Sequence, residues 1–401
     1  MTLLKHDIAL VYKRETVTPI SIGTANIFLS EESRIHDSCV ARRDIIPVYK
    51  REMIKRARAL QRYPMVDYAR THGDIFSRDV GIIPKGFTAN EYLFRRPIDI
   101  TEQSGTGIDL TDYQVKIILD STNFDFSHLY RDDGMDIAVG DGEGNLYPTY
   151  IEEMDLDNQK ATLWVKVPEI PADQTITLYL YYGNPDAPNI SDPYSTFVFF
   201  DEFIALDPEI WEIDSSNYIV SMGTVRFNSG GASLKNPLAE GYEWRKIVEV
   251  KLAYMDVADA YSGAVVIASS PHVQANNAGS DALIMAFRLK NQTKLYWWVA
   301  DGTEPSYNIK DAEEVQDTEN GQWYIIGLVY DHTNAHIYVN GTQVKSNVGH
   351  VFQKDLRYIT IGYYTGYDVN IQDTIYDWVR VRRTVLPNAE PSVSVGSEEI
   401  W

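Results

Sequence analysis

Three oxygen-bearing side chains at alternate positions, Asp141, Glu143 and Asn145, are the first residues whose types and spacing could do chemistry. Carboxylate and amide oxygens are the ligands that a hard cation such as Ca²⁺ takes in proteins. The same residues alternate with Gly142 and Gly144, a composition typical of a tight turn with solvated acids. We therefore expect no required cofactor, with Ca²⁺ as the cation that would suit this segment if one binds.

Aromatic residues in two segments could bind sugars, because the apolar face of a sugar ring packs on an aromatic ring while acids and amides take its hydroxyls. The candidate glycan-binding residues are Trp297, Trp298, Asp301, Tyr363, Tyr364 and Tyr367. Alternation along a strand sends Trp297 and Trp298 to opposite faces, so we expect at least one of them at an outer sheet face. The alternative is that these rings pack in a core, as most large aromatic residues do.

Charge is distributed unevenly along the 401 residues. Residues 1–90 hold 15 of the 36 lysines and arginines but only 10 of the 57 acidic residues, which gives this segment a net charge of +5 and leaves the remainder at −26. A basic arm on an acidic body is expected to dock on an acidic partner. The acidic body would be repelled by phosphates, so nucleic acid is excluded as a partner.

The arm carries one repeated word, Val-Tyr-Lys-Arg-Glu, at residues 11–15 and again at 48–52. A helix is predicted over residues 48–62, because apolar residues recur on one face, basic residues cover the rest, and Pro64 follows. The residues expected to dock in an assembly are Tyr12, Lys13, Arg14, Tyr49, Lys50, Arg51 and Arg58. A solvated charged face is the alternative interpretation.

Composition narrows the class of protein further. Aromatic residues make up 12% of the chain, which is typical of β-sandwiches and binding surfaces. The single cysteine, Cys39, excludes an intrachain disulfide framework. No apolar run reaches the ~18 residues of a membrane-spanning helix, and Lys5, His6 and Asp7 interrupt the start of the chain in a way that a signal peptide would not. We expect assembly in the cytoplasm and no membrane span.

Strand patterns dominate from residue 91 onward. Residues 113–120 alternate with Val115, Ile117 and Leu119 on one side. Residues 321–344 read as a hairpin whose first strand is apolar on both sides, with Trp323 and Ile325 on one and Tyr324 and Ile326 on the other. A strand of this kind is expected to be covered on both faces, as in the middle of a sandwich.

Two resemblances follow from these segments. Residues 94–187 resemble an uncharacterised β-sandwich family of archaeal, bacterial and viral surface proteins, through the segments 123–126, 134–137, 163–168 and 181–185. Residues 197–396 resemble the concanavalin A-like or laminin-G-like lectin domain, through Phe199–Phe203, the 321–344 hairpin and the closing segment 377–396. The first family implies no catalytic residues, and the second implies a jelly roll.

The lectin-like resemblance also raises the possibility of hydrolysis, because some enzymes of that fold carry Glu-x-Asp-x-x-Glu on one strand. Such a strand supplies the two carboxylates that must flank a glycosidic bond. Here Glu212 and Asp214 match, but Asn217 stands where the second glutamate belongs. No HExxH, nucleophile elbow or phosphate loop occurs either. We therefore expect no catalytic residues and a protein that is not an enzyme.

The sequence thus predicts an all-β chain with two tandem antiparallel β-sandwiches after an extended arm. The expected divisions are an arm over 1–90, a small sandwich over 91–190 and a concanavalin A-like jelly roll over 195–398. The expected function is that of an oligomeric structural or adhesion protein of a virion, in a tail, turret or capsid decoration. Its arm would dock on other subunits and its lectin-like domain would contact host glycans. The alternatives are a secreted glycan hydrolase and a cellular surface-layer protein or adhesin.

Overall fold

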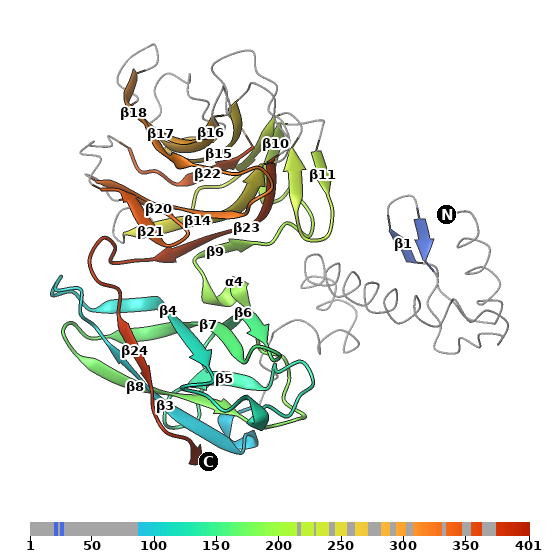
Figure 1. The fold of residues 1–401 in the computed structure, drawn as a ribbon, viewed down its shortest axis with the longest axis vertical. Helices are drawn as coiled ribbons and strands as arrows, with labels where there is room; N and C mark the ends of the chain where they lie inside the picture. The colour runs from blue at the N-terminus through green and yellow to red at the C-terminus, as the bar shows by residue number, and fades with distance from the viewer. Residues whose placement is uncertain are drawn as a thin grey trace. The chain divides into compact units, whose positions relative to one another are not determined.

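A computed structural model describes most of the chain from residue 87 onward. The described residues are 20–22, 25–27, 87–214, 218–227, 230–239, 245–254, 261–271, 282–288, 294–301, 308–330, 334–346, 354–362 and 374–401. Within them the chain is built almost entirely of antiparallel strands, which confirms the predicted all-β class (Figure 1). None of the helices in these ranges has the length and apolar character that crossing a membrane requires.

The arm is described at only two short strands, β1 (Ile20–Ile22) and β2 (Ala25–Ile27), which pair as an antiparallel hairpin. The predicted helix over 48–62 lies outside the described residues. So do all seven residues that we expected to dock in an assembly.

The first sandwich consists of two sheets. One has the order β24-β3-β8-β5, with β25 also paired to β3, and the other has the order β4-β7-β6. The strands are β3 (Phe94–Thr101), β4 (Leu110–Asp120), β5 (Ile137–Gly140), β6 (Thr149–Asp155), β7 (Lys160–Ile170), β8 (Thr175–Tyr182), β24 (Ser392–Val395) and β25 (Glu399–Ile400). Short helical turns are η2 (Ala89–Glu91), η3 (Phe126–His128) and α4 (Pro193–Thr196). Val115, Ile117 and Leu119 of β4 are buried between the sheets, as their alternation predicts.

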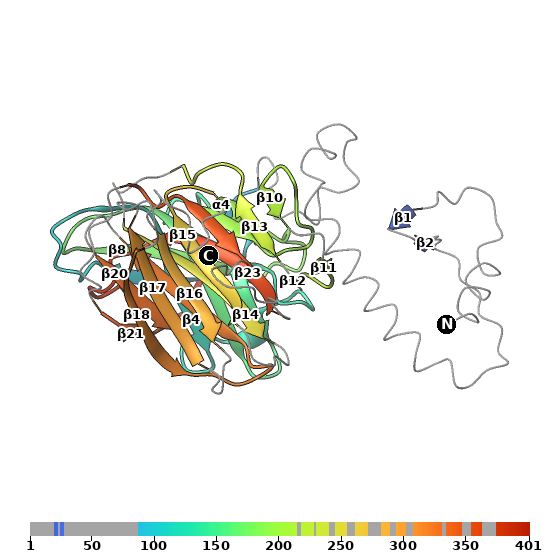
Figure 2. The same ribbon diagram turned by 90° about the horizontal axis from the view of Figure 1, so that it is seen from above.

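The second sandwich also consists of two sheets, of seven and eight strands. The seven-stranded sheet is β10 (Trp211–Asp214), β13 (Gly231–Leu234), β22 (Tyr358–Ile361), β15 (Tyr261–Ala268), β16 (Ala282–Arg288), β17 (Lys294–Asp301) and β18 (Asn308–Asp317). The eight-stranded sheet is β11 (Tyr218–Val220), β12 (Val225–Phe227), β23 (Thr374–Arg383), β14 (Lys246–Tyr254), β19 (Tyr324–Tyr330), β20 (Ala335–Val339) and β21 (Thr342–Lys345), with β9 (Phe199–Asp201) paired to β23. In the view from above, β16, β17 and β18 run side by side (Figure 2).

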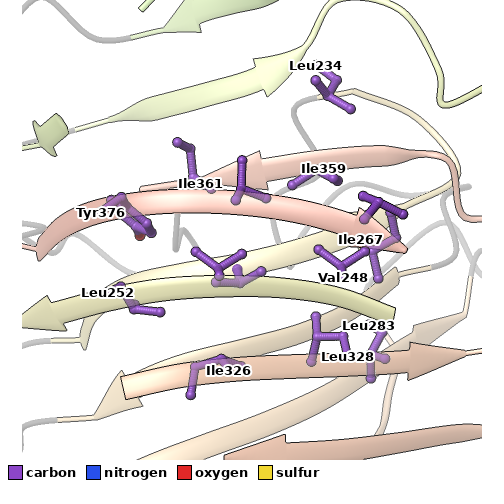
Figure 3. Close-up of a cluster of buried hydrophobic side chains, with 14 of the residues drawn as sticks. Leu234, Val248, Leu252, Ile267, Leu283, Ile326, Leu328, Ile359, Ile361 and Tyr376 are labelled. Atoms are coloured by element: carbon purple, nitrogen blue, oxygen red, sulfur yellow. The ribbon is translucent and has the colours of Figure 1, made fainter. Parts of the chain in front are cut away.

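Apolar side chains of both sheets meet in one core. The close-up in Figure 3 shows Leu252, Ile326 and Leu328 from the eight-stranded sheet and Ile267, Ile359 and Ile361 from the seven-stranded sheet in this cluster. Burial of such side chains is the main term that stabilises a fold of this kind.

The expectation that the strand after Trp323 is covered on both faces is correct for only part of its length. Tyr324 and Ile326 point into the core, and Val329 is buried on the opposite face against Ile247 and Tyr338. Trp323, however, is 39% exposed. Alternation identifies the two faces of a strand, but it does not say how far a covering layer extends along it.

The end of the chain returns to the first sandwich. β24 and β25 pair with β3, so the last strands complete a sheet that begins near residue 94 (Figure 1, red beside blue). Trp401 donates from its backbone nitrogen to the carbonyl of Leu93, at 2.9 Å, and from Nε1 to the carbonyl of Ala89, at 2.9 Å. The predicted second domain over 195–398 thus ends too late, because residues 392–395 belong to the first sandwich and the second sandwich is an insertion between β8 and β24.

Candidate functional site

The aromatic residues expected to bind sugars are only partly within the described side chains. Trp297 is 1% exposed and belongs to the core between the two sheets, so its expected role at a surface is wrong. Its position on β17 turns it inward, and no face of the ring is open to a sugar. Trp298 and Asp301 lie on β17, but their side chains are outside the described part of the structure, as are Tyr363, Tyr364 and Tyr367 altogether.

The expected oxygen ligands of the 141–145 segment organise a turn. The carboxylate of Asp141 accepts hydrogen bonds from the backbone nitrogens of Glu143 and Asn145, both at 2.9 Å, and from Nδ2 of Asn145 at 2.8 Å. Burial opposes ionisation of Asp141, but these hydrogen bonds outweigh it and lower its pKa. In the described residues, no group of three or more His, Cys, Asp or Glu side chains is placed to hold a metal ion. The carboxylate of Asp141 thus closes the turn, and the expectation about Ca²⁺ stays a prediction.

A buried carboxyl at the start of the second sandwich, Asp201, is also structural. Its oxygens accept from Trp211 Nε1 at 2.6 Å and from the backbone nitrogen of Phe203 at 2.8 Å. Burial raises the pKa of Asp201 to about 7. A raised pKa can mark a catalytic acid, but this group is fully buried beside core aromatics and has no open surface to which a substrate could come.

Arginines on the outer face of β23 form an ion cluster with carboxylates from three parts of the chain. Arg380 lies with Nε 2.7 Å from Glu249 Oε2 on β14, and with Nη1 2.6 Å from Glu152 Oε1 on β6 of the first sandwich. Arg382 lies 3.2 Å from Glu249 and 3.0 Å from Glu390. The cluster therefore joins the two sandwiches, and we call this contact the junction.

Aromatic rings surround the guanidinium of Arg380 in the junction. Its central carbon lies 4.6 Å from the ring centroid of Trp164 on β7 and 4.5 Å from that of Trp378 on β23. Trp164 in turn donates from Nε1 to Glu152 at 2.9 Å. Cation–π contacts gain strength when they are shielded from water, and Arg380 is only 3% exposed. The position and orientation of Trp378 are thus set by a buried neighbour.

The charges of the junction depend on one another. Burial alone would raise the pKa of Glu249, but the guanidiniums of Arg380 and Arg382 more than offset burial and hold its pKa at about 2. Burial opposes the charge of Arg382 as well, yet Glu249 and Glu390 raise its pKa above the usual value. Removing Glu249 would leave each of these two buried guanidiniums with a single carboxylate, Glu152 for Arg380 and Glu390 for Arg382, which is costly.

The end of β23 and the segment after it strengthen the same contact. The backbone nitrogen of Arg383 donates to Gln114 Oε1 at 2.9 Å, and that of Val385 donates to the hydroxyl of Tyr113 at 3.1 Å. The Tyr113 hydroxyl itself donates to Glu390. Burial raises the pKa of Tyr113 well above its usual value, so the phenol remains a donor at neutral pH. β4 of the first sandwich is thereby tied to the chain as it leaves the second.

The junction covers only part of the outer face of the eight-stranded sheet. Lys251 lies two residues after Glu249 on β14. It is paired with Trp378 on the neighbouring strand β23 and with Ile325 on the other neighbouring strand, β19. A register shift between Lys251 and Leu252 places Asp377 on this side of the sheet as well.

Lys251 links the charged and aromatic members of this uncovered part. Its Nζ lies 2.6 Å from Asp377 Oδ2 and 5.4 Å from the ring centroid of Trp323. Trp378 and Ile325 beside it are half-buried. We call the surface formed by these five residues (Trp323, Ile325, Lys251, Asp377 and Trp378) the Trp323 face.

The sequence contains a signal for this face, in the strand that carries Trp378. Residues alternate along the run from Trp378 to Arg382. Trp378, Arg380 and Arg382 lie on one side of the strand, and Val379 and Val381 lie on the other. A strand that alternates tryptophan and arginine with valine carries its chemistry on the side away from the core.

Family models match two parts of the chain. Residues 133–214 match a domain of unknown function (DUF2341), and residues 253–390 match the concanavalin A-like lectin/glucanases superfamily. The expected uncharacterised domain and the expected concanavalin A-like domain are thus found, each by a model that covers less than half of the chain, but the matches do not tie the first domain to archaeal or viral surface proteins. No curated protein matches the chain.

Solved structures are similar at the level of fold. A Bacillus licheniformis beta-glucanase is 13% identical with a TM-score of 0.36, and the match covers 46% of this chain and 98% of the glucanase. A Trypanosoma rangeli sialidase in complex with sialic acid is 14% identical with a TM-score of 0.36, over 62% of this chain and 42% of the sialidase. At this identity the likeness concerns the fold alone.

These comparisons correct the expectation that the chain is not an enzyme. The description of the family that matches residues 253–390 covers glucanases as well as lectins. The missing glutamate at Asn217 is therefore no ground for calling the chain non-enzymatic.

Proposed function

We propose that this chain is a carbohydrate-binding protein and that its second sandwich makes the contact with the glycan. The observation that carries the proposal is the match of residues 253–390 to the concanavalin A-like lectin/glucanases superfamily, on a body that is built from two large antiparallel sheets. The Trp323 face supports it, because the face combines aromatic rings with a carboxylate and an amine in the way that sugar sites do.

The proposed setting is a virion, in which the arm docks on neighbouring subunits and the two sandwiches meet glycans of the host. The uneven charge of the chain supports this arrangement, because residues 1–90 carry a net +5 and the rest carries −26. The arm would find acidic surfaces among other subunits, while the body would stay apart from them by repulsion. A tail, turret or capsid decoration would each meet this description.

The purified full chain, applied to an array of neutral and sialylated oligosaccharides, tests the proposed function. We expect retention on a chemically related group of glycans and no retention on the remainder. Each retained glycan is then incubated with the protein and assayed for new reducing ends, which separates binding from turnover. A chain that retains no glycan at micromolar concentration would refute the proposal.

A further inference from the structure

One tryptophan stands apart from the others. Among the tryptophans whose side chains the structure describes, only Trp323 is exposed. It comes directly before β19 and shares the side of Ile325, which is the outer side of the eight-stranded sheet. Covering an exposed indole removes a large apolar surface from water, and folding leaves this gain in free energy unused.

Polar groups lie directly beside this ring. Lys251 and Asp377 form an ion pair at 2.6 Å, and their side chains are 34% and 29% exposed, so both are still reached by solvent. Together they present a donor and an acceptor next to the indole, with charges that cancel. A hydroxyl pair of a sugar ring can bond to such a pair while the ring stacks on the tryptophan.

We propose, on the basis of the glycan-binding function above, that the Trp323 face is the binding surface and that its ligand is an uncharged glycan chain. Trp323 supplies the stacking ring, and Lys251 and Asp377 supply the hydrogen bonds. The ligand is neutral because the charges of Lys251 and Asp377 already neutralise each other. Residues 91–401 also carry a net charge of −26, which disfavours sialylated or sulfated sugars.

The size of the face agrees with a chain of sugars rather than a single ring. Trp378, Lys251 and Ile325 sit on three neighbouring strands, β23, β14 and β19. Two strand spacings amount to about 10 Å. A second aromatic ring, that of Trp378, therefore lies on the same face at the opposite side of Lys251 from Ile325 and Trp323.

The junction makes this face rigid. Arg380 stacks 4.5 Å from the ring of Trp378 and is held by Glu249 and by Glu152 of the first sandwich. A binding surface that needs no reorganisation loses less free energy when it binds. The first sandwich thus serves the proposed site by fixing one of its rings.

Replacement of Trp323 tests the assignment in the full-length protein. Titration calorimetry with the best neutral oligosaccharide from the array should show at least about tenfold weaker binding for Trp323→Ala, which corresponds to a loss of about 1.4 kcal/mol. Trp323→Phe should retain part of the affinity, and Asp377→Asn should weaken binding with the ring intact. Tyr130→Ala on the first sandwich is the matched control, because Tyr130 is 43% exposed.

Each outcome bears on a separate statement. If the wild-type chain binds a neutral glycan and Trp323→Ala binds it equally well, the Trp323 face is not the site, although the proposed function stands. If the wild-type chain prefers sialylated glycans, the neutral ligand class is wrong. If it binds no glycan, the proposed function and this inference fall together. Unchanged melting temperatures of the variants show that a loss of binding is not a loss of fold.

Discussion

Glu249 is the residue on which the charges of the junction converge, because Arg380 and Arg382 both reach its Oε2. Neither guanidinium is open to water, with side-chain exposures of 4% and 8%. A buried ion pair adds little to stability compared with an apolar isostere, but loss of one partner is costly. The role of this carboxylate is therefore seen best when it is removed.

Glu249→Gln should lower the free energy of unfolding by about 3 kcal/mol, because two buried cations lose a shared partner. The pKa of Glu249 is about 2 in the fold against 4.5 for a free glutamate. The contribution of its ionised carboxylate to the free energy of unfolding is therefore complete above about pH 4.5 and is lost as the pH falls toward 2. Denaturant unfolding at several pH values measures both effects. The wild-type curve should fall over this range, and the variant should lack that part of the fall. Equal slopes in both proteins would contradict the assignment.

At the scale of elements, strands could be predicted from the sequence but their partners could not. The alternation of Val115, Ile117 and Leu119 identifies the inward side of β4 because one face of that strand meets a core. The same kind of alternation in Ser392–Val395 indicates a strand, yet it says nothing about a partner almost 300 residues away. Pairing of that kind depends on where β23 leaves the second sandwich.

The candidate site shows the same limit. Trp297 lies on a strand and Trp323 directly precedes one, and both have apolar neighbours. The sequence therefore does not distinguish them. The structure buries Trp297 between two sheets and leaves Trp323 beyond the edge of the layer that covers Val329. Which ring is open depends on what packs over each face of its sheet, a property of packing between elements rather than of either segment.

Removal of residues 392–401 should therefore damage the first sandwich and spare the second. β3 would lose the strands that pair with it on one edge, and Val393 and Val395 would no longer pack against the first core. Hydrogen exchange should show lost protection in β3 and β8 but retained protection in β14 and β19. Ile400→Ser is the control, since Ile400 is 89% exposed. Equal loss of protection in both sandwiches would show that the second cannot hold its structure without the first.

At the scale of the whole molecule, the insertion places the second sandwich between two segments of the first. The chain leaves the second sandwich through residues 383–390, which contact Gln114 and Tyr113. The ion pair of Glu152 and Arg380 adds a further link. Two connections and a charged junction hold the bodies more firmly than a single linker would. A glycan bound on the eight-stranded sheet would thus be presented by a two-sandwich unit.

The charges of the complete chain lead to the last prediction. A segment of net +5 and a body of net −26 attract each other between copies as well as toward other subunits. Such attraction extends over roughly 10 Å at 0.1 M salt and is strongly screened at higher salt. Sedimentation velocity should show self-association of the full chain at 20 mM salt and much less at 500 mM, while a chain without residues 1–86 should sediment as a monomer at both concentrations. Association of the shortened chain at low salt would place the contact on the sandwiches themselves and remove the arm from this role.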